Sequence, residues 1–95
     1  KIRKERGRLI ILKALAEQTN GTLDSSVLEE VMPVFAIRET RQWVHEQLEY
    51  LAELNAVRLT RAGTVMVATL KVAGRRHLDR DEILLGVTRP SEPGA

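Results

Sequence analysis

The sequence predicts one mainly α-helical domain with a small β-hairpin towards its C-terminal end. Three observations lead to this expectation. The 95 residues are enough for one modest hydrophobic core. Apolar residues recur at helical spacing in several segments, and two short segments of β-branched residues lie close together before the last of them. We expect residues 1–85 to form the domain and residues 86–95, rich in proline and glycine, to form a flexible tail.

The first helix is expected over residues 4–18. Ile11, Leu12 and Leu15 form one apolar stripe at helical spacing. Three further residues widen the apolar surface: Leu9, Ile10 and Ala14. Because a helix that is apolar on two sides usually contacts two bodies, we expect it to touch the domain core and a second subunit.

The next two helices are separated by a proline. A very short strand at Thr22 and Leu23 precedes the second helix, which must stop near Pro33 because proline lacks an N–H and clashes with the preceding turn. The third helix, over residues 38–54, is the longest periodic segment. Its core-facing positions follow 3–4 spacing: Val44, Leu48, Leu51 and Leu54.

A hairpin and a fourth helix complete the domain. The segments AVRLTR and TVMVATL carry β-branched residues and are separated at Ala62 and Gly63, which is typical of a hairpin. Residues 71–85 then return to a helical pattern. Two helices joined by a short turn and followed by a hairpin form a helix-turn-helix with a wing, so we expect a winged helix-turn-helix fold.

Composition excludes several kinds of function. The chain has no cysteine, so disulfides and thiolate metal sites are excluded, and a reducing, cytoplasmic compartment is favoured. No apolar run approaches the roughly 20 residues that span a bilayer, so no membrane partner is expected. His45 and His77 lack companions at ligand spacing, and no nucleophile or carboxylate pair has a catalytic setting. We therefore expect no metal, no cofactor and no enzyme activity.

Residues 44–57 resemble the recognition helix and first wing strand of winged-helix regulators of the ArsR, MarR and PadR types, which commonly show V…L..L...GLV here. TLKVAGRRHL, residues 69–78, is similar to the LT..GR..L that follows the wing in those proteins. The resemblance covers roughly residues 9–78 and extends to small regulators encoded by Mu-like prophages. Asn55 departs from the usual glycine, and the chain lacks the cysteine pairs of metal sensors and the extra helices that form the MarR-type pocket.

The resemblance implies sequence-specific binding to duplex DNA by a small transcriptional regulator, acting as a repressor by steric occlusion. In a winged helix the N-terminal half of the third helix enters the major groove, where arginine reads guanine and glutamine reads adenine. The residues expected to contact DNA from this helix are Arg38, Thr40, Arg41, Gln42 and His45. The residues expected to contact phosphates around the wing are Arg58, Arg61 and Lys71. The basic N-terminus could lie beside the groove or remain a solvated end.

The charge of the third helix leaves an alternative open. Residues 38–55 contain two arginines and four glutamates, which gives a net charge of −2. Carboxylates repel phosphates, although most of these acids lie in the half that leaves the groove. The alternative is a winged-helix module for protein–protein contact without DNA binding, with Trp43 and the acidic helix face towards the partner.

A homodimer is expected from unpartnered apolar residues. The residues assigned to the interface are Leu9, Ile10, Ala14, Ile83, Leu84 and Leu85. The alternative for the last three is that they close the core over the wing. A two-fold dimer would place two recognition helices about one DNA turn apart and predict a palindromic site.

Overall fold

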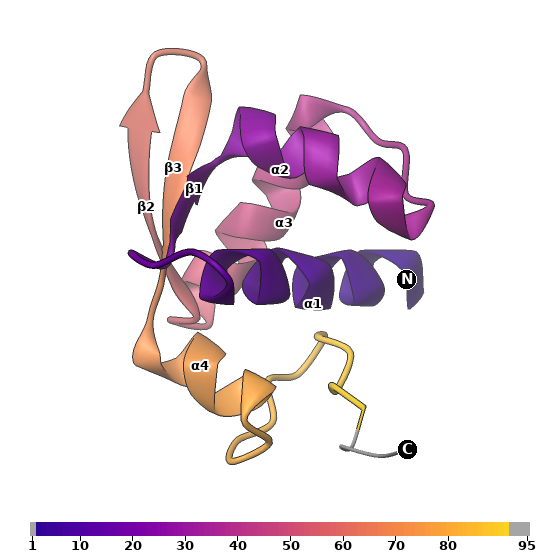
Figure 1. Ribbon diagram of the computed structural model, residues 1–95, viewed down its shortest axis with the longest axis vertical. Coiled ribbons are helices and arrows are strands. Elements are labelled where there is room, and N and C mark those ends of the chain that lie inside the picture. The colour runs from indigo at the N-terminus through magenta and orange to yellow at the C-terminus, as the bar shows by residue number, and fades with distance from the viewer. Residues whose placement is uncertain (1, 92–95) are drawn as a thin grey trace.

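Helix α1 (Ile2–Ala16) crosses the middle of the domain (Figure 1). The computed structural model describes residues 2–91 of the 95-residue chain. After α1 these residues form β1 (Thr22–Asp24), α2 (Ser25–Val31), the 3-10 helix η1 (Met32–Phe35), α3 (Arg41–Glu53), β2 (Val57–Ala62), β3 (Val65–Leu70) and α4 (Val72–Leu78). The described residues thus contain four α-helices and one antiparallel sheet, in the expected order.

The sheet has three strands in the order β1-β3-β2, so β3 is central. Val57 pairs with Leu70 at the base of the β2–β3 hairpin, and Ala62 pairs with Val65 beside its tip. Gly63 forms the turn with φ of 64°, a left-handed conformation that glycine adopts without steric cost. The structure confirms both the hairpin and the short strand expected at residues 22 and 23.

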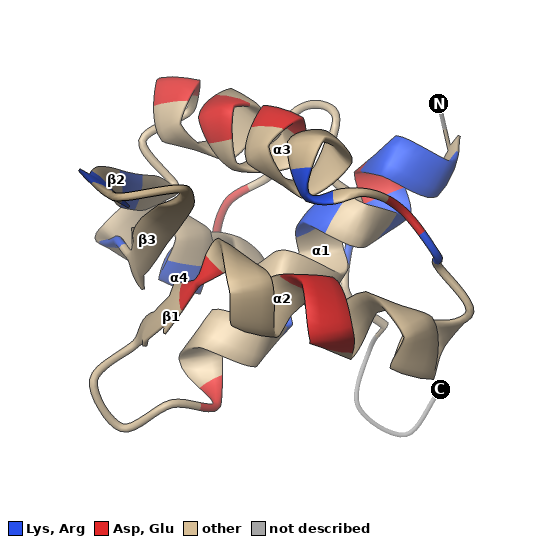
Figure 2. Ribbon diagram, turned by 90° about the horizontal axis from the view of Figure 1, so that it is seen from above, with Lys and Arg blue, Asp and Glu red and all other residues tan. Residues whose placement is uncertain are grey.

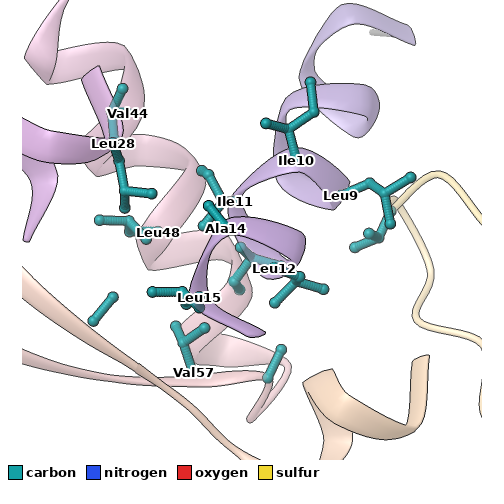
Figure 3. Close-up of a cluster of buried hydrophobic side chains, with 14 of the residues drawn as sticks. Leu9, Ile10, Ile11, Leu12, Ala14, Leu15, Leu28, Val44, Leu48 and Val57 are labelled. Carbon is teal, nitrogen blue, oxygen red and sulfur yellow. The ribbon is translucent and has the colours of Figure 1, made fainter. Parts of the chain in front are cut away.

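Apolar side chains from α1, α2, α3 and the sheet form the core (Figure 3). Ile11 lies between α1 and α3, whereas Leu9 lies on the side of the C-terminal segment (Figure 3). Val44, Leu48 and Leu51 are fully buried, as their spacing predicted. The order of the chain and its apolar periodicity therefore place α3 against α1.

Helices α1 and α3 approach closely at Gly7. The indole of Trp43 lies over this residue, and a Cβ at Gly7 would come within 2.6 Å of Cη2 of Trp43. Trp43 is partly buried against the core in consequence. Its main contact is therefore internal packing, which weakens the expectation that it leads a surface for a protein partner.

Helix α4 is shorter than expected, and the prediction of a helix over residues 79–85 was wrong. The helix ends at Leu78, and Arg80 adopts φ of 65°. The backbone N–H groups of Arg80 and Asp81 turn back to the carbonyls of His77 and Arg76, at 3.1 Å and 2.8 Å. These two hydrogen bonds satisfy carbonyls in the last turn of α4, and the chain changes direction after them.

Residues 86–91 pack against the domain, whereas we expected a flexible tail from residue 86. Val87 and Pro90 are buried, and the Thr88 N–H donates to the Glu5 carbonyl at 3.2 Å. His77 anchors the segment from α4. Its Nδ1 accepts the Leu84 N–H at 3.1 Å, so Nε2 carries the proton and donates to the Thr88 carbonyl at 2.9 Å. The expected tail also includes residues 92–95, which lie outside the described residues.

Arg8 and Tyr50 hold the start of the same segment. The Arg8 guanidinium lies 3.6 Å from the centroid of the Tyr50 ring and donates to the Gly86 carbonyl at 2.8 Å. The Tyr50 hydroxyl donates to the Leu85 carbonyl at 2.8 Å. Arg8 is thus a structural residue that joins α1, α3 and the C-terminal segment.

Packing within the single chain covers most of the residues that were assigned to the dimer interface. Four of the assigned residues are buried within the single chain, and these are Leu9, Ile10, Ala14 and Leu84. The chain's own C-terminal segment lies on the Leu9 side of α1 (Figure 3). The alternative for residues 83–85, that they close the core, holds for Leu84 alone, which packs beside His77. Ile83 and Leu85 remain 59% and 79% exposed.

Candidate nucleic-acid interface

Two features fix the N-terminal end of α3: the side-chain cap at Thr40 and the buried side chain of Ile37. The Thr40 Oγ1 accepts the Trp43 N–H at 3.1 Å, which satisfies a helix N–H that has no partner within the helix. Ile37 is buried and its N–H donates to the Met32 carbonyl at 3.1 Å. Because Ile37 points inward, Arg38 is left exposed, and its side chain has no hydrogen bond or ion pair among residues 2–91.

Arg41 and Gln42 differ in how freely they could reach a ligand. Nε of Arg41 lies 3.3 Å from Oε1 of Glu29, and both side chains are about one-third exposed, at 39% and 32%. Gln42 is exposed and makes only a long 3.5 Å hydrogen bond to Glu46. Of the expected base-reading residues, Arg38 and Gln42 are therefore the accessible pair, and Arg41 would have to leave Glu29.

His45 is half-buried and belongs to an internal hydrogen-bond network. Its Nε2 lies 2.8 Å from Oγ of Ser25, which is fully buried. The same Oγ accepts the Met66 N–H at 3.0 Å. His45 therefore links α3 to α2 and β3, and the base contact that we expected would require its ring to leave Ser25.

The exposed face of α3 is acidic along most of its length. Gln42, Glu46, Glu49 and Glu53 recur at helical spacing and are all exposed. Figure 2 shows the acidic positions following one another along α3, with basic positions at its N-terminal end. We call Glu46, Glu49 and Glu53 the acidic stripe. Only the first turn of the helix is free of it.

The expected wing residues do not form one surface. Successive strand residues point to opposite faces, so Arg58 and Arg61 project from opposite sides of β2. Nη2 of Arg61 lies 3.8 Å from Oε2 of Glu49, within the acidic stripe. Lys71 lies at the base of the hairpin, and its Nζ donates to Oδ1 of Asn55 at 3.4 Å. Arg58 and Arg61 are an odd number of positions apart, so the sequence already indicated that they lie on opposite faces of the strand.

The first turn of α1 carries the basic residues that the sequence left open, either beside the groove or as a solvated end. Nε of Arg3 lies 2.9 Å from Oε2 of Glu39, in the segment that leads into α3. Lys4 is exposed nearby in the chain and has no side-chain partner among the described residues. The basic run was visible in the sequence, but its neighbour 36 residues away was not. The cationic end thus comprises Arg3, Lys4, Arg38 and Arg41.

Residues 2–91 contain no group of three His, Asp or Glu side chains arranged to hold a metal ion. No helix within these residues is long and apolar enough to cross a membrane. Comparison with models of protein families, with curated proteins and with solved structures finds no match to this chain.

Proposed function

We propose that this chain is a winged helix-turn-helix domain that binds duplex DNA and acts as a small transcriptional regulator by steric occlusion. The order α1-β1-α2-α3-β2-β3, with β1 paired to β3, supports this layout. The hairpin tip and the N-terminal end of α3 lie towards the same end of the domain (Figure 1). A helix end and a hairpin on one side are the two parts that such a domain presents to DNA.

The observation that carries the proposal is the cationic end beside the first turn of α3. Arg38 and Gln42 are exposed there, and they are the side-chain types that pair with guanine and adenine edges. Arg3 approaches the same place from α1, and it could contact a phosphate on leaving Glu39, with which it pairs at 2.9 Å. Lys4, its neighbour in the chain, is exposed. The N-terminal N–H groups of a helix add a positive potential that favours an anion.

The acidic stripe constrains how DNA is approached. Carboxylates at Glu46, Glu49 and Glu53 repel phosphates, so the helix enters the groove end-on with its first turn, and its later turns point away. Neutralising the stripe by three Glu→Gln changes is expected to raise affinity for any duplex modestly. A large rise would mean that the stripe lies close to the DNA backbone.

The proposal is tested by fluorescence anisotropy of labelled duplexes, first of random sequence and then of sequences selected from a random pool. Affinity should fall steeply with salt, with a slope of about 0.9 for each phosphate contact. Arg38→Gln should weaken a selected duplex by about 1–3 kcal/mol and relax its sequence preference. Arg76→Gln is the matched control, because it removes one half-exposed arginine charge from α4.

One observation favours a second candidate, a module that binds a basic protein. The acidic stripe is continuous, exposed and adjacent to the hairpin. No binding to any duplex at about 50 mM salt, where phosphate contacts are strong, would contradict the DNA proposal. A tight complex with a basic protein that is lost in the Glu→Gln variant would then support the second candidate.

A further inference from the structure

An apolar groove runs along α1 between α2 and α4, which lie on either side of it (Figure 1). Ile10 and Ala14 form its floor. One wall comes from Val27 and Val31 of α2, and the other comes from Leu78 of α4. The groove encloses about 500 Å³, and in the described part of the chain no residue of α3 lines it. It is therefore a surface separate from the cationic end.

A second hollow of about 350 Å³ continues the groove towards the start of α1. Ile10, Lys13 and Phe35 line both spaces, so the two are contiguous. Phe35 and Val27 are 40% and 37% exposed, although both are large apolar side chains. A partner that covers this surface therefore gains the free energy of removing apolar side chains from water.

Four basic side chains surround the two spaces. Lys13 and Arg75 line the groove, and Arg6 and Arg89 line the hollow. All four are exposed, and none has a side-chain hydrogen bond or ion pair among the described residues. Within residues 2–91, Glu17 is the one acidic residue that lines either space. The spaces thus favour an occupant that combines apolar side chains with several negative charges.

The spread of these charges favours a polypeptide over a small anion. Lys13 and Arg75 stand on different helices, and Arg6 precedes Lys13 by seven positions on α1, which is about 10 Å of helix axis. One carboxylate cannot face all of them, whereas a chain with several carboxylates can. Ile10 to Glu17, the part of α1 along the groove, also covers about 10 Å. Apolar side chains at positions i, i+4 and i+7 of a second helix cover the same length.

We propose that the groove binds an acidic amphipathic helix of another protein, with its apolar side chains on the floor of the groove. Its carboxylates face Lys13 and Arg75 along the groove, and Arg6 and Arg89 at the hollow. In such a complex the apolar side chains supply affinity, and the flanking charges orient the helix. The interaction goes beyond the proposed function and does not rest on it, because the cationic end remains free.

The proposal is tested by fluorescence anisotropy of a labelled synthetic peptide of about 18 residues, which is long enough to form a helix. Leucines occupy one face at positions i, i+4 and i+7, glutamates flank them, and alanines fill the rest. One control peptide carries lysine for every glutamate, and the other has the same composition with its leucines spread around the helix. The full chain should bind the first peptide with micromolar affinity and neither control. Absence of binding, or equal binding of all three, overturns the proposal.

Charge reversal locates the binding surface. Lys13→Glu with Arg75→Glu should lose the glutamate peptide and gain the lysine peptide. Arg38→Glu with Arg58→Glu is the matched control, since both arginines are exposed, lack side-chain partners among the described residues and lie outside both spaces. At about 150 mM salt, where distant charges are screened, this control should keep the glutamate peptide. An equal loss in both variants would mean a general effect of net charge and would refute the proposal.

The same two variants separate this proposal from the proposed function. The Arg38 and Arg58 changes should weaken binding to duplex DNA, whereas the Lys13 and Arg75 changes should affect DNA much less. Each proposal can therefore fail without the other.

The apolar wall provides an independent test. Val27→Ser with Val31→Ser should weaken the glutamate peptide on the order of tenfold. Val34→Ser with Val72→Ser is the matched control, because these side chains are 79% and 74% exposed and lie outside both spaces. Circular dichroism checks that each variant is folded. A folded wall variant that binds as tightly as the control contradicts the proposal.

Two other occupants of the groove have distinct outcomes. If sedimentation equilibrium shows a dimer that the Lys13 and Arg75 changes dissociate, a second copy fills the groove and the proposal fails. Dodecanoate, a small apolar carboxylate, should compete only weakly with the peptide. If it binds more tightly than the peptide, the occupant is a small molecule, and the proposal fails.

Discussion

Replacing Ser25 with alanine is expected to lower the free energy of unfolding by about 2–3 kcal/mol. Alanine leaves the size of the site almost unchanged, so the loss comes from hydrogen bonds and not from a cavity. The Ser25 Oγ is fully buried, accepts the Met66 N–H at 3.0 Å and contacts His45 Nε2 at 2.8 Å. These bonds join α2, β3 and α3, so their loss should affect the whole domain.

The expected loss of unfolding free energy is the sum of what Met66 and His45 each lose when the Ser25 hydroxyl is removed. Met66 is 3% exposed, so its N–H has no water to replace Ser25, and an unsatisfied buried donor costs about 1–3 kcal/mol. His45 is only half-buried and can turn to water, so its loss lies at the low end, near 0.5–1 kcal/mol. For a domain of this size, a total of 2–3 kcal/mol lowers the melting temperature by on the order of 10–20 °C.

Urea denaturation followed by circular dichroism measures this loss, and a double-mutant cycle with His45→Ala isolates the Ser25–His45 coupling. Thr64→Ala, at an exposed turn position, is the control and should change stability by less than about 0.5 kcal/mol. A Ser25→Ala change equally small would refute the reasoning. If His45→Ala reduced DNA affinity while leaving stability intact, His45 would return to the role of a base contact.

Three further changes test other parts of the fold by the same denaturation assay. Asp24 caps α2, and the Ser26 hydroxyl followed by the Val27 N–H lowers the pKa of its carboxyl below the ordinary value of 3.8. Asp24→Ala should therefore cost about 1 kcal/mol at neutral pH, and the cost should fade as pH drops below about 4, whereas Asp24→Asn should lose little. Gly7→Ala should destabilise by at least about 1 kcal/mol, because Cη2 of Trp43 lies 2.6 Å from the new Cβ, and no loss would mean that the indole moves freely. Ala36→Gly should stabilise by about 0.5–1 kcal/mol, because Ala36 has φ of 64°; destabilisation would contradict the assigned backbone conformation.

Local rules were sufficient for the order of the elements and for the inward face of α3. The spacing of Val44, Leu48 and Leu51 predicted which side of α3 is buried, and the separation at Gly63 predicted the hairpin turn. Local rules failed after Leu78, where the apolar residues that suggested a longer helix follow a left-handed turn at Arg80. Leu84 is buried because the chain reverses there and packs beside His77, and not because it continues a helical stripe.

The sequence by itself determined that the chain forms helices and a hairpin, because periodicity, caps and turn residues act over a few neighbouring positions. It also determined that α3 has basic residues only at its start. Only the tertiary structure decided which charged and polar groups meet, since those contacts join residues far apart in the chain. It brought Arg3 to Glu39 across 36 residues and His45 to Ser25 across 20. Packing of whole elements sets such pairs, and packing depends on every side chain in the core at once.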